Sequence, residues 1–168
     1  MDPVSSPITI RTAIFSDLPL VQDIAHASWP SAYSKIISKK QIDYMLEMMY
    51  SLESLEKQVF EGNQFILAEK DGAAIGFASF MFRENGVYKL SKLYLLPEAK
   101  NTGVGKALLK EIIAKVISLG GKELILQVNR QNKAVGFYEK MGFEILYEFD
   151  FNIGEGYVMK DYVMSLKL

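Results

Sequence analysis

The hydrophobic pattern of the chain begins with residues 8–13, where apolar and polar side chains alternate. This period of two is typical of a half-buried strand. A helix is predicted directly afterwards, because apolar residues then recur at helical spacing. Asp17 is a candidate cap, Pro19 stands in the first turn, and we expect Trp29 and Pro30 to end this helix.

Two further amphipathic helices are expected before residue 63. Each is defined by apolar residues three or four positions apart, which place one stripe of the helix against a core. We expect the second helix to end at Gly62, since glycine commonly follows the last turn of a helix. The defining positions are Ile42, Met45, Leu46 and Met49 in the first helix and Leu55, Val59 and Phe60 in the second.

The remainder of the chain is expected to form strands and helices joined by short turns. Asp71-Gly72 is a type I′ turn signal and predicts a hairpin. The order β-α-α-α-β-β-β-α-β-α-β-β predicts a mixed α/β sheet with helices on its faces. We expect one domain over residues 1–168. The predicted ranges are strands over 65–69, 74–82, 87–96, 123–128, 143–152 and 157–168, and helices over 104–119 and 133–141.

Composition narrows the chemistry that this domain can perform. The chain has no cysteine and one histidine, His26, which excludes thiolate zinc sites and leaves little for a catalytic triad. We therefore expect no metal. The net charge of −1 lacks the basic excess of a nucleic-acid binder, and no apolar run has the length of a membrane span or a signal peptide. The expected location is the cytoplasm, without nucleic-acid or membrane partners.

A glycine-bearing loop precedes the helix over 104–119. Gly103 and Gly105 stand at the helix start, where backbone N–H groups can converge on a phosphate. Lys100 and Lys106 flank them and suit a ligand with two or more negative charges. The alternative is that the glycines only make a tight turn between a strand and a helix.

The helix over 133–141 carries Tyr138 on its apolar face. Ala134, Phe137 and Met141 share this face, so the pattern by itself favours a core position for the tyrosine. Asn132 lies just before the helix and is by itself typical of a cap or turn.

Together these segments resemble the GNAT superfamily of acyl-CoA N-acetyltransferases. The resemblance spans about residues 65–143. It implies a mixed, mostly antiparallel twisted sheet with helices on both faces, and transfer of an acetyl group from acetyl-CoA directly to a primary amine. The chain departs from the family at Lys100, where Gln or Arg is usual, and at Asn101, where Gly is common. The matching residues are Leu93-Tyr94-Leu95-Leu96-Pro97, then Lys100, Gly103 and Gly105, and then Asn132, Ala134, Tyr138 and Gly142-Phe143.

The resemblance implies a cofactor site residue by residue. In the family, the strand before the loop splays from its neighbour and pairs with the pantetheine arm, while the loop amides hold the pyrophosphate. Asn132 would bond the pantetheine, and Lys140 is a further candidate contact. The implied acetyl-CoA contacts are Leu93, Tyr94, Leu95, Lys100, Asn101, Thr102, Gly103, Val104, Gly105, Lys106, Asn132 and Lys140.

The resemblance also implies catalytic roles. Tyr138 matches the tyrosine that gives a proton to the leaving thiolate, a role that suits a hydroxyl with a pKa of about 10. A backbone N–H near Leu95 would polarise the thioester carbonyl. Some members carry a glutamate as general base where this chain has Gln127, so no base is assigned.

The resemblance also implies that the helical segment after the first helix forms one wall of the acceptor site. Aromatic side chains and a carboxylate there suit a cation, although each one individually is also typical of a packed or solvent-facing residue. Residues 41–58 and 154–164 loosely resemble the PaiA-type spermidine/spermine acetyltransferases. A protein N-terminus, another small amine, and a non-catalytic role in acyl-CoA binding stay as alternatives. The candidate acceptor residues are Trp29, Tyr33, Tyr44 and Glu47.

Charge is divided unevenly along the chain. Residues 100–140 contain 8 Lys/Arg and 3 Asp/Glu, whereas the remainder contains 11 and 17. The basic segment coincides with the expected cofactor site, and the acidic remainder suits a cationic acceptor. The apolar tail over 157–168 is a candidate shared strand in a homodimer, a form that is common in the family.

Overall fold

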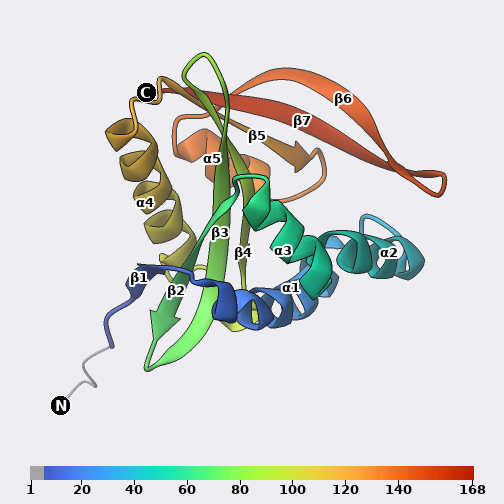
Figure 1. Ribbon diagram of the computed structural model, residues 1–168. Coiled ribbons are helices and arrows are strands. Elements are labelled where there is room, and N and C mark those ends of the chain that lie inside the picture. Colours follow the sequence, from blue (N-terminus) through green and yellow to red (C-terminus); the bar gives the residue numbers. More distant parts are fainter. Residues whose placement is uncertain (1–5) are drawn as a thin grey trace.

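A seven-stranded sheet with helices on both faces forms the framework of the protein (Figure 1). The structure is a computed structural model that describes residues 6–168. The strands are β1 (Thr9–Thr12), β2 (Gln64–Lys70), β3 (Ala73–Glu84), β4 (Val87–Leu95), β5 (Glu123–Asn129), β6 (Glu144–Gly154) and β7 (Tyr157–Lys167). The helices are α1 (Leu18–Tyr33), α2 (Lys39–Tyr50), α3 (Leu52–Phe60), α4 (Val104–Ser118) and α5 (Ala134–Lys140), with short 3₁₀ helices at Phe15–Asp17 and Pro97–Ala99.

The sheet is mixed and mostly antiparallel, as the sequence predicts. The strand order is β1-β2-β3-β4-β5-β7-β6, and every neighbouring pair is antiparallel except β4 and β5. Parallel neighbours need a crossover connection, and α4 provides it. The pairing of β4 with β5 covers only part of each strand.

Two hydrophobic cores lie on opposite faces of the sheet. Neighbouring residues of β2 show this, because Ile66 belongs to the core beneath α4 and α5, whereas Leu67 belongs to the core beneath α1–α3. The helices α1, α2 and α3 lie together in Figure 1, away from α4. Within residues 6–168, no helix is long and apolar enough to cross a membrane.

The predicted order of elements is confirmed, but the predicted end of the first helix is wrong. Trp29 and Pro30 do not end it, since α1 continues to Tyr33. A proline removes only its own N–H donor, and Pro30 lies on the exposed side of the helix. Trp29 and Tyr33 are both buried, and their ring centroids lie 4.5 Å apart, so they hold the last turn against the core.

Helix α3 makes less apolar contact than its pattern predicts. Leu55 is buried, whereas Phe60 is 84% exposed and Val59 is also exposed. Phe60 is the last residue of the helix. Apolar residues at helical spacing therefore predicted the helix, but they did not predict how much of it is covered.

The C-terminal strand lies inside the sheet. β7 pairs with β5 along one edge and with β6 along the other, so both of its edges are occupied within the chain. The outer edges of the sheet belong to β1 and β6. A strand shared between two copies of the chain would therefore have to be one of these two.

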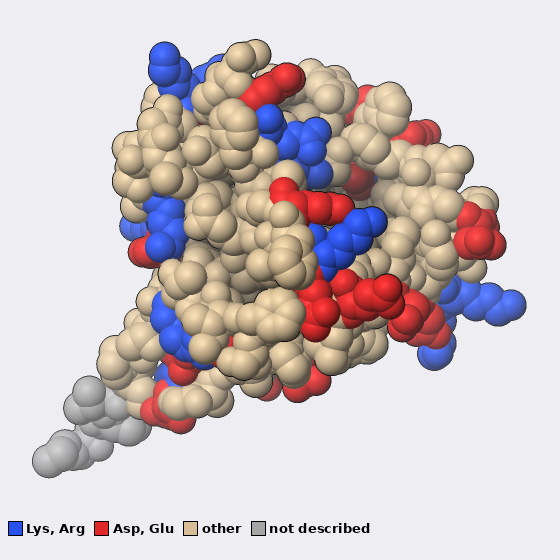
Figure 2. All heavy atoms as spheres, in the orientation of Figure 1, with Lys and Arg blue, Asp and Glu red and all other residues tan. Residues whose placement is uncertain are grey.

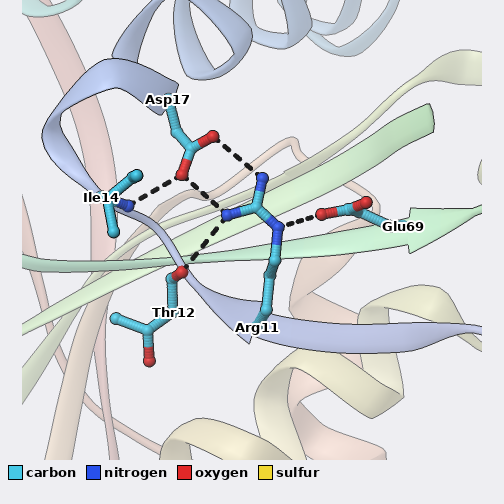
Figure 3. A network of polar contacts seen from close by, with 5 residues as sticks. All are labelled: Arg11, Thr12, Ile14, Asp17 and Glu69. Carbon is cyan, nitrogen blue, oxygen red and sulfur yellow. Dashed lines mark hydrogen bonds and ion pairs between the residues drawn. The ribbon is translucent and has the colours of Figure 1, made fainter. Parts of the chain in front are cut away.

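A polar network fixes β1 to the start of α1 (Figure 3). The two terminal nitrogens of Arg11 donate to the carboxylate of Asp17 at 2.7 and 2.9 Å, and Nε donates to Glu69 of β2. The Ile14 backbone N–H also donates to Asp17, at 2.8 Å. The Arg11 guanidinium and this backbone bond lower the pKa of Asp17 to about 2. Asp17 is thus a buried carboxylate whose charge is matched by direct partners.

Candidate active site

The parallel strands β4 and β5 separate at one end of the sheet. Their pairing runs from Val87 opposite Glu123 to Leu90 opposite Leu126 and stops there. β4 nevertheless continues to Leu95, and β5 continues beyond the last pair as well. The two strands therefore splay apart, as the family resemblance implies.

The splay leaves backbone groups of β4 without a strand partner on one side. The Leu96 N–H donates to Ile75 of β3 at 2.9 Å. Backbone groups alternate in direction along a strand, so the amides of Leu93 and Leu95 point to the opposite side, toward the splay. An extended ligand that carries amide groups can pair with such an edge.

A cleft of about 1020 Å³ extends from the splay to the start of α4. Four separate parts of the chain line it: the end of α1, the end of β4, the loop before α4, and the start of α5. Its lining comprises Ser28, Ser31, Ala32, Lys35, Ile36, Leu93, Tyr94, Leu95, Lys100, Asn101, Gly103, Gly105, Lys106, Gln131, Asn132, Lys133, Ala134 and Phe137.

The loop before α4 has the backbone shape of a phosphate cradle. Asn101 and Gly103 are both left-handed, with φ of 62° and 87°, and Gly103 directly precedes the first turn of α4. Asparagine adopts this conformation more readily than most residues, which explains how the chain tolerates Asn101 in place of glycine. A Cβ at Gly105 would lie 3.7 Å from Leu95, so this glycine borders the cleft itself. The unpaired N–H groups of the first turn are directed at the cleft end, where an anion is stabilised.

The charge around the cleft is basic. Its lining includes Lys35, Lys100, Lys106 and Lys133, and none of the lining residues is acidic. Lys100 reaches across to α1, where its Nζ donates to Ser31 at 3.3 Å. The acidic side chains gather elsewhere, over α1–α3 on the face shown in Figure 2. The cleft therefore fits a ligand with several phosphates.

The structure brings together nine of the twelve residues expected to contact acetyl-CoA, because nine of them line this cleft. The other three are Thr102, Val104 and Lys140. Thr102 donates its hydroxyl to the Ala99 carbonyl, and the side chain of Val104 is buried in the core. Lys140 is exposed on α5 and does not line the cleft.

The contribution of α1 to the cleft was missed by sequence reasoning. Ser28, Ser31 and Ala32 lie in the last turns of α1. The sequence predicted that this helix ends at Trp29 and Pro30. No local signal marks them, since small and polar residues on a helix surface are ordinary. They are found only once α1 is placed against the splay.

Tyr138 reaches the splay from α5, on the face of the sheet opposite to α1. It is 7% exposed, and its ring packs against Phe137 and Phe143 with centroids 5.3 and 5.6 Å apart. It also lines a small cavity of about 40 Å³ between β4 and β5, together with Lys92 and Gln127. Burial raises the pKa of Tyr138, as does its neighbour Tyr33, so the hydroxyl keeps its proton at neutral pH. Core packing of the ring and access of the side chain to a cavity are thus both present.

Two more tyrosines and Asn132 are linked above this cavity. The hydroxyls of Tyr33 and Tyr94 lie 2.9 Å apart, and the Asn132 side-chain amide donates to Tyr33 at 3.4 Å. The Asn132 side-chain oxygen accepts from the Ala134 N–H at 2.9 Å, at the start of α5. Asn132 therefore bonds the first residue of α5 and is also part of the cleft wall. Burial raises the pKa of both tyrosines.

The residues expected to hold the acceptor are not gathered in one place. Tyr33 lines the small cavity, but Trp29 is buried among the rings of Tyr33, Tyr50 and Tyr94. Tyr44 donates its hydroxyl to the Ile153 carbonyl at 2.8 Å, so it joins α2 to β6. Glu47 faces solvent.

Charged residues that the sequence did not single out lie beside the splay on the α1 face. Burial, followed by the charge of Lys89, lowers the pKa of Lys92 to about 8, and its Nζ lies 5.3 Å from the centroid of the Tyr50 ring. Burial raises the pKa of Asp161 to about 6. Within the described part of the chain, no group of three or more His, Asp or Glu could hold a metal.

Acetyltransferases are found among the known proteins that resemble this chain in sequence and in structure. A family model described as an acetyltransferase (GNAT) domain matches residues 34–154. A spermidine N(1)-acetyltransferase of Thermoplasma acidophilum is 32% identical over 144 residues, which are 82% of this chain and 89% of that protein.

Solved structures agree with this assignment. The PaiA N-acetyltransferase of Thermoplasma acidophilum, determined in complex with coenzyme A, is 29% identical, with a TM-score of 0.83 over 96% of this chain and 99% of that one. The ribosomal-protein-S18-alanine N-acetyltransferase of Escherichia coli shares the fold, with 20% identity and a TM-score of 0.74 over 96% of this chain and 94% of that one. The chain therefore belongs to the GNAT family of acetyltransferases and is an N-acetyltransferase that uses acetyl-CoA.

Proposed function

We propose that acetyl transfer takes place in the splay between β4 and β5, with acetyl-CoA lying along the cleft and Tyr138 acting as general acid. The observation that carries the proposal is the coincidence of three features at one point. The strand pairing ends there, the lysine-lined cleft opens there, and Tyr138 reaches it from α5. Acetyl-CoA supplies an activated acetyl group and a thiolate leaving group.

The residues of the chain divide the work of binding between backbone and side chains. The amides at the start of α4 and the ammonium groups of Lys100 and Lys106 hold the phosphates. The backbone amides of Leu93 and Leu95 pair with the pantetheine arm, and the N–H of Leu95 polarises the thioester carbonyl. These contacts orient the reacting carbonyl before the amine arrives.

Tyr138 supplies the proton that the leaving group needs. A thiolate that leaves into a buried site is unstable until it is protonated, and a tyrosine with a raised pKa carries a proton at every pH at which the enzyme is expected to work. The small cavity beside Tyr138 gives the hydroxyl access to the splay.

We propose a small primary amine as the acceptor, with a polyamine such as spermidine as the first candidate. The support is the 32% identity with a spermidine acetyltransferase over most of both chains. The setting that we propose is the cytoplasm, which fits a chain without cysteine.

A second candidate is an amine that carries a carbonyl or carboxylate nearby, such as a peptide N-terminus. Lys89 and Lys92 favour it, because both lie on the α1 face of the sheet and neither forms a salt bridge within residues 6–168. The lowered pKa of Lys92 reduces its repulsion of a polyamine, so this lysine does not exclude the first candidate.

An acceptor screen decides between these candidates. The enzyme is mixed with acetyl-CoA and with spermidine, spermine, a monoamine or short peptides with free N-termini, and release of free thiol is followed. The proposal expects release with spermidine at a kcat/KM at least about tenfold above that with the peptides. Faster release with the peptides would select the second candidate. Binding of acetyl-CoA without thiol release for any amine would contradict the proposed site.

A further inference from the structure

Within the part of the chain that the structure describes, Asp161 is a buried carboxylate without the hydrogen-bond partners that such a group normally has. It lies on β7, opposite Asn129 of β5 and Phe149 of β6, and is 8% exposed. Its Oδ1 is buried and has no hydrogen-bond partner among residues 6–168. Buried polar atoms in folded proteins are nearly always hydrogen-bonded, so an exception of this kind points to a ligand or a function.

The register of the strands shows which face Asp161 occupies. Residues directly opposite or two apart on a strand share a face, so Asp161 lies on the same side as Met159 and Gln127. Met159 belongs to the core beneath α1 and α2. Gln127 lines the small cavity in the splay, and its side-chain oxygen accepts from Lys89 at 3.2 Å. Asp161 therefore lies on the α1 face of the sheet, one residue pair away from the cavity that Tyr138 enters from the other face.

The groups around Asp161 leave its charge only partly balanced. Lys89 of β4 and Arg130, just after β5, attract it, while Asp150 of β6 repels it. Arg130 is already engaged, since its guanidinium donates to Glu148 at 2.5 Å and to Asp150 at 2.7 Å. The remaining cation, Lys89, bonds the amide of Gln127 rather than a carboxylate.

One more neighbour comes from α1. Burial raises the pKa of Tyr33, and the charge of Asp161 raises it further. The Tyr33 hydroxyl bonds Tyr94 and Asn132 at the cleft wall. Tyr33 belongs to the core beneath α1–α3, so it lies on the same face of the sheet as Asp161. This is the side from which an acceptor amine must approach if the cofactor occupies the cleft.

We propose that Asp161 is the general base of the enzyme, holding the acceptor as an ammonium ion and taking from it the proton that must leave before the amine can attack. This inference rests on the proposed function. It supplies a carboxylate for a role that neither Gln127 nor the lysines of β4 perform.

The protons and electrons of the transfer balance with this assignment. One N–H proton of the ammonium passes to the Asp161 carboxylate and from there to solvent. The freed lone pair forms the C–N bond, the C–S bond breaks with its electrons going to sulfur, and Tyr138 protonates the sulfur. The second proton on nitrogen returns through water to the Tyr138 oxygen. The products are an amide, a thiol and one proton released to solvent.

The acidity of Asp161 suits this role. Burial, which is the largest cause, and the charge of Asp150 raise its pKa to about 6, against the opposing charges of Lys89 and Arg130. A carboxylate with this pKa is ionised at neutral pH, yet it is a stronger base than an ordinary aspartate.

The test is the pH profile of kcat/KM for spermidine in the full-length enzyme, at saturating acetyl-CoA and from about pH 5 to pH 9.5, followed by thiol release. The wild-type profile should rise through an apparent pKa near that of Asp161 and then level off. In Asp161→Asn, kcat/KM at neutral pH should fall about 100-fold. Its profile should keep rising by about one log unit per pH unit, because only the neutral fraction of the amine then reacts. Binding of acetyl-CoA, measured by calorimetry, should be unchanged.

Asp150→Asn is the matched control, because it removes a carboxylate from the same neighbourhood at an exposed position of β6. It should keep the plateau and most of the activity. The inference is overturned if Asp161→Asn keeps the wild-type plateau, or if the wild-type profile itself lacks the acidic limb; the second result needs no variant to fold. Loss of acetyl-CoA binding in Asp161→Asn would show a structural role and would also overturn it. If the wild-type enzyme releases no thiol with any amine, the result contradicts the proposed function and not the role of Asp161 alone.

Discussion

The two sides of the splay differ in the kind of chemical group that lines them. On the cofactor side, the cleft is lined by backbone amides, two left-handed residues in a loop, and lysines whose ammonium groups lie near the surface. On the side that we propose for the acceptor, the groups are side chains: Tyr33 and Asp161 are buried, and Lys92 is half-buried. The first side recognises charge and an extended shape, which many substrates of a family share. On the second side, burial shifts the pKa values of Lys92 and Asp161 toward neutrality, which suits proton transfer.

The largest expected effect on acetyl-CoA affinity comes from the backbone of the loop before α4. In Gly103→Val, a β-branched residue must adopt a φ of 87°, so the loop rearranges and the affinity for acetyl-CoA should fall about 100-fold. Isothermal titration calorimetry measures it. Gly120→Val is the matched control, because Gly120 has a φ of 83° but lies at the far end of α4. It should lose stability without losing affinity. Equal losses of affinity in both variants would contradict the proposal that the loop before α4 holds the phosphates of acetyl-CoA.

The difference between the two sides also explains how far the sequence could be read. The glycine loop, the flanking lysines and Tyr138 are close together in sequence and carry a recognisable order, so the sequence could single out most of the residues that the structure gathers at the cleft and the splay. The order of strands and helices could also be predicted, because the apolar residues within each element recur with the period of a strand or of a helix.

The acceptor side could not be predicted in this way. Asp161, Lys92 and Tyr33 come from β7, β4 and α1, and only the pairing of β5 with β7 and the docking of α1 bring them together. Trp29 and Tyr44 were expected there from their residue type and from the segment that the family resemblance assigns to the acceptor. Trp29 proved to be core, and Tyr44 serves to join α2 to β6. Local periodicity carries no information about which distant strand lies next to which.

The next prediction concerns stability, because an unpaired buried charge costs folding free energy. The pKa of Asp161 is about 6 in the folded state and about 3.9 when unfolded, so its ionisation destabilises the fold as pH rises between these values. Asp161→Asn should therefore raise the free energy of unfolding by about 2–3 kcal/mol at neutral pH. Urea unfolding at several pH values measures this gain, which should shrink toward zero below about pH 4. A variant that is less stable than wild type would indicate a pairing role for Asp161.

Asp17 offers the opposite case, a buried carboxylate with its partners in place. Its pKa is lowered to about 2, so its contribution to stability is present above its unfolded pKa and is lost as pH falls through about 2. Asp17→Asn should lower the free energy of unfolding by about 1 kcal/mol at neutral pH, a value reduced for solvent screening because Arg11 is 42% exposed. The same urea experiment shows it, and acetyl-CoA affinity should not change. A stabilised variant would contradict the role given to the Arg11 pair.

The smallest effect concerns the lysines of the cofactor side. Lys106→Gln should weaken acetyl-CoA binding about fivefold at low salt, and the difference should shrink as ionic strength rises, because exposed charges are screened. Lys140→Gln is the matched control and also tests Lys140 as a cofactor contact. Since Lys140 lies outside the cleft, its replacement should leave the affinity within about twofold. A salt-independent loss in Lys106→Gln would indicate a packing role instead.

The most direct test of the account is the rate of the chemical step in Tyr138→Phe. This change removes only the hydroxyl and keeps the ring that packs against Phe137 and Phe143. Single-turnover thiol release with spermidine, with Tyr147→Phe as an exposed control, separates chemistry from binding. We predict a rate lower by about 100-fold or more, with acetyl-CoA affinity unchanged. A variant that keeps the wild-type rate across the pH range would contradict the assignment of Tyr138 as the general acid.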